Sequence, residues 1–180
     1  MPSLLEMASL FLSKRLFYFR PMKNKKPAPV KIILEALDKT GYHLFIHVTV
    51  NGKRCRFLID TGASHTVVDK TYFEKYFGKK SLKTVKQATT GLHSSTTESY
   101  FGKIKEMKIG STLTKNYIAA AVDLSHVNNT YKSLKKRSIQ GILGSDLMLK
   151  YKMTIDYGGL KLTPLNPLPD KIIGMKQKGT

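Results

Sequence analysis

Residues 57–64 have the sequence Phe-Leu-Ile-Asp-Thr-Gly-Ala-Ser, and they decide how the rest of the chain is interpreted. A short apolar run is typical of a buried strand. Asp60 at its end is therefore a carboxylate in a poorly solvated position, where ionisation is costly and the affinity for a proton can be tuned. Thr61 adds a hydroxyl beside it, and Gly62 lets the backbone turn sharply and bring an amide N–H close to the carboxylate. The pattern predicts a buried strand that ends in one chemically useful aspartate.

The residues before this stretch predict a rigid neighbour for that strand. Within residues 42–50, leucine, isoleucine and valine side chains alternate with histidine, phenylalanine and threonine side chains, which is the period-2 pattern of a half-buried strand. Asn51-Gly52 is a strong signal for a tight hairpin. The chain then runs directly into residues 54–59, so the strand that ends at Asp60 has a defined antiparallel neighbour. A catalytic carboxylate requires rigid support of this kind.

The residues after the motif predict further short strands with few helices. Asp69 is expected to cap a helix over residues 70–77, which Gly78 ends. Residues 84–110 are expected to form a long hairpin with its tip near Gly91, and residues 123–138 a polar loop with helical potential. The remaining expected elements are strands within residues 30–37, 66–68, 112–122, 153–156 and 160–163, and a short helix over residues 145–150.

A second segment completes a family resemblance. Residues 140–146, Gln-Gly-Ile-Leu-Gly-Ser-Asp, contain two apolar residues followed by glycine, and they follow the Asp-Thr-Gly motif at a distance that suits a single-lobed enzyme. Together the two motifs resemble the retropepsin-like (retroviral-type) aspartyl proteases, and most of all the bacterial ones. The resemblance implies an all-β, mainly antiparallel fold with one or two short helices, a single-lobed acid protease barrel that is dimeric.

The resemblance also assigns roles to residues. It implies catalytic roles for Asp60, Thr61 and Gly62, and support of the catalytic loop by Ile142, Leu143 and Gly144. Thr61 would bridge two loops across a two-fold axis, and the Gly62 amide would donate to the carboxylate. The implied substrate-binding residues are Ala63 and, at the tip of a flap-like hairpin, Thr89, Thr90, Gly91 and Leu92.

The chain carries one Asp-Thr-Gly motif and no second copy. Peptide hydrolysis of the implied type uses two carboxylates that share one proton. The second carboxylate must then come from another copy of the chain, which predicts a homodimer acting on a peptide or protein substrate. Ala63 occupies the position where many two-lobed acid proteases have serine, and its dyad is expected to work nearer neutral pH. The expected function is that of an aspartic endopeptidase with no cofactor.

Two other functions are compatible with the same residues. A retropepsin-like fold can serve as a catalytically inactive dimerisation or peptide-binding module. A basic protein can also bind nucleic acid, because the chain has 31 basic and 12 acidic residues and a net charge of +19. Its basic residues are scattered, however, and no nucleic-acid-binding motif is present, so a solvated basic surface is expected and a nucleic-acid partner is not.

Composition and the termini define the remaining expectations. The single cysteine, Cys55, excludes an internal disulfide framework and is expected in the core. The five histidines show no metal-ligand spacing, so no metal site is expected. Residues 1–29 are expected to be an extension and basic linker, with Met22 as an alternative start, residues 30–165 the protease domain and residues 166–180 a tail. No stretch is long enough to span a bilayer. We expect a cytoplasmic protein, or one whose residues 1–21 associate weakly with a membrane surface.

Overall fold

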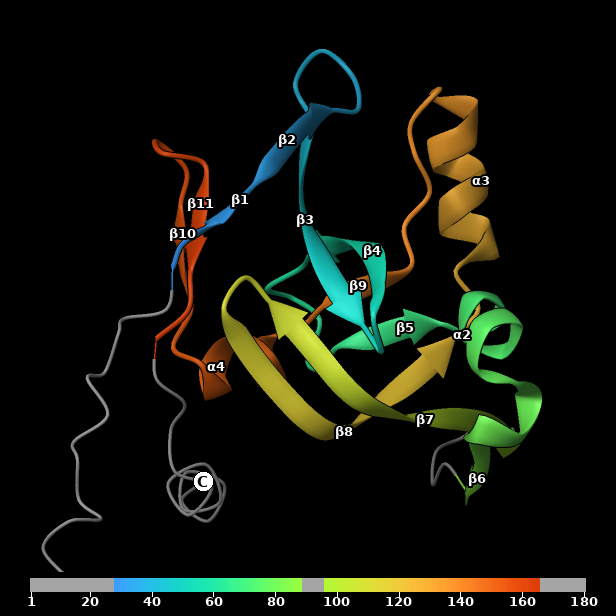
Figure 1. Cartoon of the computed structure of the whole chain (residues 1–180). Helices are drawn as coiled ribbons and strands as arrows, with labels where there is room; N and C mark the ends of the chain where they lie inside the picture. The colour runs from blue at the N-terminus through green and yellow to red at the C-terminus, as the bar shows by residue number, and fades with distance from the viewer. Residues whose placement is uncertain (1–27, 89–95, 166–180) are drawn as a thin grey trace, which may run out of the picture.

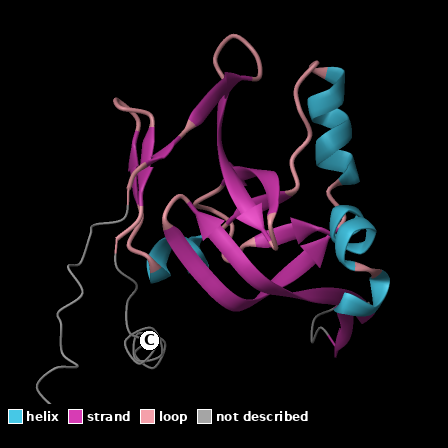
Figure 2. Ribbon diagram, in the orientation of Figure 1, coloured by secondary structure: helices cyan, strands magenta, loops and turns pink. Residues whose placement is uncertain are grey.

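The computed structural model describes residues 28–88 and 96–165, and these form a mainly β structure with three short α-helices (Figures 1 and 2). The expected mainly antiparallel β class is confirmed. The expected N-terminal extension up to residue 27, the hairpin tip and the C-terminal tail lie outside the described residues. The strands are β1 (Val30–Lys31), β2 (Ile33–Ala36), β3 (Tyr42–Val50), β4 (Lys53–Ile59), β5 (Val67–Asp69), β6 (Leu82–Ala88), β7 (Thr96–Ile109), β8 (Thr112–Val122), β9 (Gly141–Leu143), β10 (Thr154–Asp156) and β11 (Lys161–Thr163).

Eight strands form one sheet in the order β2-β3-β4-β9-β5-β8-β7-β6. An additional antiparallel pairing of β3 with β7, through Thr49 opposite Lys108, joins distant parts of this sheet. Strands β3, β4, β9, β5, β8 and β7 therefore close into a six-stranded barrel. A smaller sheet in the order β1-β11-β10 lies at one side of the molecule, away from α2 and α3 (Figure 1).

The β3–β4 hairpin forms as the sequence predicts. Val50 lies opposite Lys53, so the connection has two residues, Asn51 and Gly52. Both have positive φ, 45° and 83°, which is the geometry that favours Asn-Gly in tight hairpins. The hairpin fixes the register of β4, and with it the position at which Asp60 leaves the sheet.

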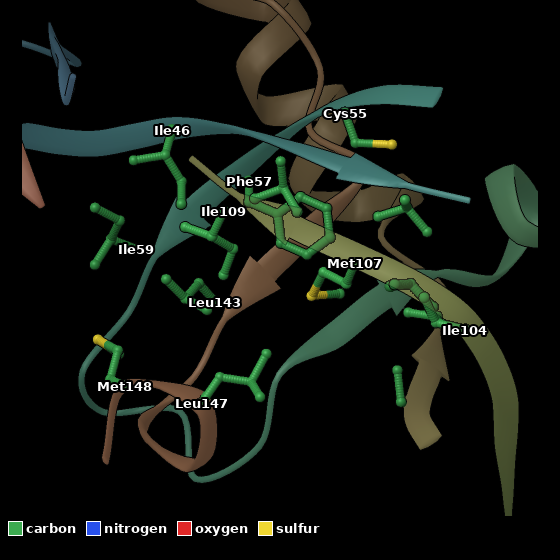
Figure 3. Packing of buried hydrophobic residues seen from close by; sticks show 14 of the residues in the cluster. Ile46, Cys55, Phe57, Ile59, Ile104, Met107, Ile109, Leu143, Leu147 and Met148 are labelled. Atoms are coloured by element: carbon green, nitrogen blue, oxygen red, sulfur yellow. The ribbon is translucent and has the colours of Figure 1, made fainter. Parts of the chain in front are cut away.

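The main core fills the barrel. Buried side chains from β3, β4, β7, β9 and α4 (Ser145–Lys150) converge there (Figure 3). Phe57 and Leu143 are fully buried, and the Phe57 ring lies against Gly141, where even a methyl group would clash with it. Complete burial of such side chains contributes about 1.5–3 kcal/mol each. Strand β4, which leads into the Asp60 loop, and its neighbour β9 are thus anchored in the main core.

A second cluster covers the other face of β3. Phe45 is fully buried against Leu124, Tyr131 and Ile139, so β3 is buried on both faces at this point rather than half-buried as its alternation predicts. Helix α3 (Ser125–Ser133) supplies Tyr131, and it forms within the segment expected to be a loop with helical potential. The described residues therefore contain three short α-helices where the resemblance implied one or two.

Helix α2 (Lys70–Phe77) matches the predicted helix in both bounds. The Asp69 carboxylate accepts a hydrogen bond from the Thr71 amide, and Gly78 ends the helix with φ of 83°. A 3₁₀-helix, η2 (Lys79–Ser81), then leads into β6. Among the described residues, no helix is long and apolar enough to cross a membrane.

Candidate active site

Asp60 leaves the barrel where β4 ends, in a loop that its own carboxylate helps to shape. Its amide N–H donates to the Leu143 carbonyl at 3.1 Å. One carboxylate oxygen, Oδ1, accepts the Gly62 amide at 2.9 Å and the Ala63 amide at 3.3 Å. None of the described residues donates to the other oxygen, Oδ2. The loop thus fixes one oxygen of a partly exposed carboxylate and leaves the second available.

Strand β9 supports this loop by pairing with the strands before and after it. It pairs in parallel with β4, which places Ile142 beside Leu58 and Leu143 beside Ile59. It also pairs with β5, so that the segments before and after the loop share one neighbour. The structure therefore brings the two sequence motifs together.

Gly144 lies directly against the far end of the loop. A methyl group in place of its hydrogen would lie 2.5 Å from the His65 carbonyl oxygen and 2.7 Å from the Thr66 nitrogen. These are backbone atoms, so only glycine allows this approach. The next residue, Ser145, donates its amide N–H to the Ala63 carbonyl at 2.8 Å and its hydroxyl to the same oxygen at 3.0 Å. Backbone contacts between segments far apart in sequence therefore define the shape of the loop.

Asp146 is the contributor that sequence reasoning missed. Its position at a helix start suggested a helix-terminal role, but Gly144 is the N-cap of α4 and no side chain caps that helix. The Asp146 carboxylate instead accepts the Thr66 amide at 2.9 Å, the Thr66 hydroxyl at 2.7 Å and the Tyr117 hydroxyl. The Thr66 hydroxyl in turn accepts the Gly144 amide at 2.9 Å. No local sequence signal reveals these partners, because they come from β8 and from a residue 80 positions away.

The environment of Tyr117 keeps its hydroxyl protonated and able to donate. Burial raises the pKa of the Tyr117 phenol, and the hydrogen bond to the Asp146 carboxylate raises it further. Because the phenol does not ionise at ordinary pH, it remains a donor to the carboxylate. The cluster of Thr66, Tyr117, Gly144 and Asp146 therefore links the loop to β8 and α4 through satisfied hydrogen bonds.

A pocket of about 570 Å³ opens beside the loop. Ala63, one of the predicted substrate-binding residues, lines it together with Phe101 of β7 and Ile118 of β8, whose side chain is 65% exposed. The other predicted substrate-binding residues, Thr89, Thr90, Gly91 and Leu92, lie outside the described residues. Strands β6 and β7 form the two arms of the predicted hairpin.

Other reactive side chains in the described part of the chain lie elsewhere. Cys55 is buried in the core, where burial raises the pKa of its thiol and keeps it protonated. Asp69 is occupied as the cap of α2. No cluster of three or more histidine, cysteine or acidic residues within residues 28–88 and 96–165 is placed to hold a metal ion.

Comparison with known proteins assigns the family. The family model described as aspartyl protease matches residues 46–147, more than half of the chain, and this span contains both motifs. The chain belongs to the aspartyl protease family. The resemblance inferred from the sequence is confirmed at this level. A comparison with curated proteins found no match.

The solved structures that are similar to this chain include the following three. A retropepsin-like aspartic protease from Rickettsia conorii is 22% identical, with a TM-score of 0.49 over 79% of this chain and 98% of that one. The retroviral protease-like domain of Ddi1 from Leishmania major is 15% identical, with a TM-score of 0.47 over 71% and 95%. EIAV protease in complex with the inhibitor HBY-793 is 16% identical, with a TM-score of 0.39 over 62% and 89%. The family assignment itself rests on the family model.

The Asp146 cluster predicts a graded loss of stability. Asp146→Ala leaves the buried Thr66 amide without its acceptor and should lower the free energy of unfolding by about 2–3 kcal/mol, whereas Tyr117→Phe removes one hydrogen bond and should cost about 1 kcal/mol. Urea unfolding measures both values, and hydrogen exchange at the Thr66 amide reports the local effect. Equal stability of the two variants, with unchanged exchange at Thr66, would contradict the assigned contacts.

Proposed function

We propose that this protein is an aspartic endopeptidase whose active site is completed by a second copy of the chain, with one Asp60 from each. The observation that carries the proposal is the state of the Asp60 carboxylate. Oδ1 is held by two backbone amides, and Oδ2 receives no hydrogen bond from the described residues. A carboxylate fixed in this way can meet a water molecule or a second carboxylate without first rearranging. The family assignment supports the same reaction class.

The mechanism requires both carboxylates. Two aspartates held close together cannot both ionise easily, so they share one proton. The ionised carboxylate removes a proton from a water molecule, which attacks the carbonyl carbon of the peptide bond. The protonated carboxylate donates a hydrogen bond to the carbonyl oxygen as negative charge develops there. Proton transfer to the amide nitrogen then allows the C–N bond to break. Asp60 would supply both groups, and Thr61 and Gly62 would fix the position of each.

The surface beside the loop suits contact with a second copy. An open hollow of about 520 Å³ there is lined by Thr61, Ser145, Met148, Leu149, Lys152, Met153 and Ile155. Leu149 is 52% exposed although it is apolar. Nearby, β10 lies at the edge of the small sheet, and β11 is its one partner among the described strands. Exposed apolar side chains and an unpaired strand edge are features that another chain can cover, and a partner placed here would bring its own loop towards Asp60.

Asp60→Asn tests the catalytic assignment. The amide keeps the size of the carboxylate but cannot act as the base, so cleavage should fall by at least about a thousandfold while the fold and the dimer persist. Digestion of a peptide library read by mass spectrometry measures the activity, and Asp38→Asn, a change at an exposed aspartate in the turn between β2 and β3, is the matched control. If Asp60→Asn cleaved as well as the wild type, the proposal would be wrong. A wild-type dimer that cuts no peptide between pH 3 and pH 8 would instead indicate a binding module.

Leu149→Lys tests the proposed dimer surface. Burying an unpaired ammonium group at the interface should raise the dimer dissociation constant by about tenfold or more and reduce activity at low protein concentration. Leu113→Lys, at an apolar residue of β8 that is 40% exposed, introduces the same charge elsewhere. Sedimentation equilibrium should separate the two variants. Equal dissociation constants would place the interface on another surface.

Ala63→Ser tests the expected pH dependence. A serine hydroxyl that donates to the ionised pair stabilises the charged form, so its absence leaves the shared proton more tightly held. Activity of the wild type should then be greatest above about pH 4, and Ala63→Ser should extend activity to lower pH. Profiles of kcat/KM against pH for the two proteins measure this. A wild-type optimum below about pH 4 would contradict the expectation.

A further inference from the structure

A basic hollow lies at the opposite end of β4 from Asp60. The pocket has a volume of about 560 Å³ and is bordered by the β3–β4 turn, the end of α2 and the middle of β7. Lys53 begins β4 and Asp60 follows its last residue, and at about 3.3 Å per strand residue the two lie roughly 23 Å apart. The residues that line the hollow are Asn51, Lys53, Tyr76, Phe77, Ser81, Lys103, Lys105 and Glu106.

The charge around this hollow is unbalanced. Lys53, Lys103 and Lys105 line it and are exposed, and a fourth ammonium group, that of Lys75, lies 5.4 Å from the centre of the Tyr76 ring. Glu106 is the one carboxylate among the lining residues. The single ion pair found within the described ranges joins Arg56 to Glu35, neither of which lines the hollow. Lysines gathered in this way repel one another, and a bound anion would relieve that repulsion.

Hydrogen bonds and ring packing hold the walls of the hollow in place. The Asn51 amide donates to the Glu106 carbonyl at 2.8 Å, and the Glu106 amide donates to the Asn51 side-chain oxygen at 3.0 Å, which fastens the β3–β4 turn to β7. Tyr76 packs on Tyr72 with ring centres 4.6 Å apart, and the Lys53 ammonium lies 4.7 Å from the centre of the Tyr76 ring. The Tyr76 side chain is nevertheless 42% exposed. The hollow therefore offers an apolar ring as well as positive charge.

We infer that this hollow binds an acidic peptide segment, with carboxylates on Lys53, Lys103 and Lys105 and an apolar side chain on Tyr76. A peptide is favoured over nucleic acid because the site has ammonium groups without an arginine and is a compact pocket rather than a charged groove that could follow a phosphate backbone. That the segment belongs to a substrate rests on the proposed function. Its acidic residues would then lie at least about seven extended residues from the bond that is cut.

Fluorescence anisotropy on an Asp60→Asn background tests binding separately from catalysis. The probe is a labelled ten-residue peptide with four glutamates and one phenylalanine, and the reference is the same peptide with glutamine at those four positions. The double variant Lys103→Glu/Lys105→Glu should weaken binding of the acidic peptide about tenfold or more. The control Lys39→Glu/Lys108→Glu makes the same change in net charge at exposed lysines that do not line the hollow, and should stay within about twofold of the parent.

Each other outcome overturns the inference. An equal loss in both double variants would show that net charge, and not the hollow, attracts the peptide. Equal binding of the glutamine peptide would exclude recognition of carboxylates. Tighter binding of a single-stranded oligonucleotide, lost in the Lys103→Glu/Lys105→Glu variant alone, would identify a nucleic-acid site. The anisotropy measurements need no cleavage, so they give the same answer whether or not Asp60 is catalytic. The two proposals can therefore fail independently.

Discussion

The contact between Gly144 and the backbone of His65 and Thr66 is the constraint on which the loop around Asp60 depends. Two chain segments approach so closely there that no side chain fits between them. The approach is possible because β9 pairs with both β4 and β5, which begin and end the loop. Hydrogen bonds from Ser145 to the Ala63 carbonyl and between Asp146 and Thr66 then complete the fit. The position of Asp60 is therefore set by backbone packing more than by its own side chain.

In the proposed mechanism, the loop holds one aspartate in position, but that aspartate alone is insufficient. Two backbone amides donate to Oδ1 of Asp60, so the fold of the loop already orients the carboxylate before a substrate binds. A single carboxylate cannot act at once as the base for water and as the acid for the carbonyl oxygen. A second copy of the chain supplies the missing group in the proposed mechanism. The proposed second copy would cover the exposed Leu149 and the edge of β10 that no described strand pairs with.

The two ends of β4 would then serve different purposes. At one end the strand delivers Asp60 to a loop in which a backbone amide holds Oδ1 of the carboxylate and the Thr66 hydroxyl accepts the Gly144 amide. At the other end Lys53 borders a hollow where three lysines face a single carboxylate, that of Glu106. The excess of basic residues, which composition alone assigns to a solvated surface, becomes specific only where the fold gathers several lysines beside an aromatic ring. The tertiary structure thus gathers a few of the scattered lysines at one place on the surface.

Local signals in the sequence were sufficient for much of the fold. The bounds of β3, α2, β8 and α4 agree with the expected ranges, because a tight Asn-Gly turn, an aspartate cap and a terminal glycine act within a few residues. The Asp-Thr-Gly and Ile-Leu-Gly motifs also identified the family. The partners of Asp146, the burial of Phe45 beneath α3 and the lysine hollow could not be predicted in this way. Each of these joins residues far apart in the chain, and only the closure of the barrel decides which of them meet.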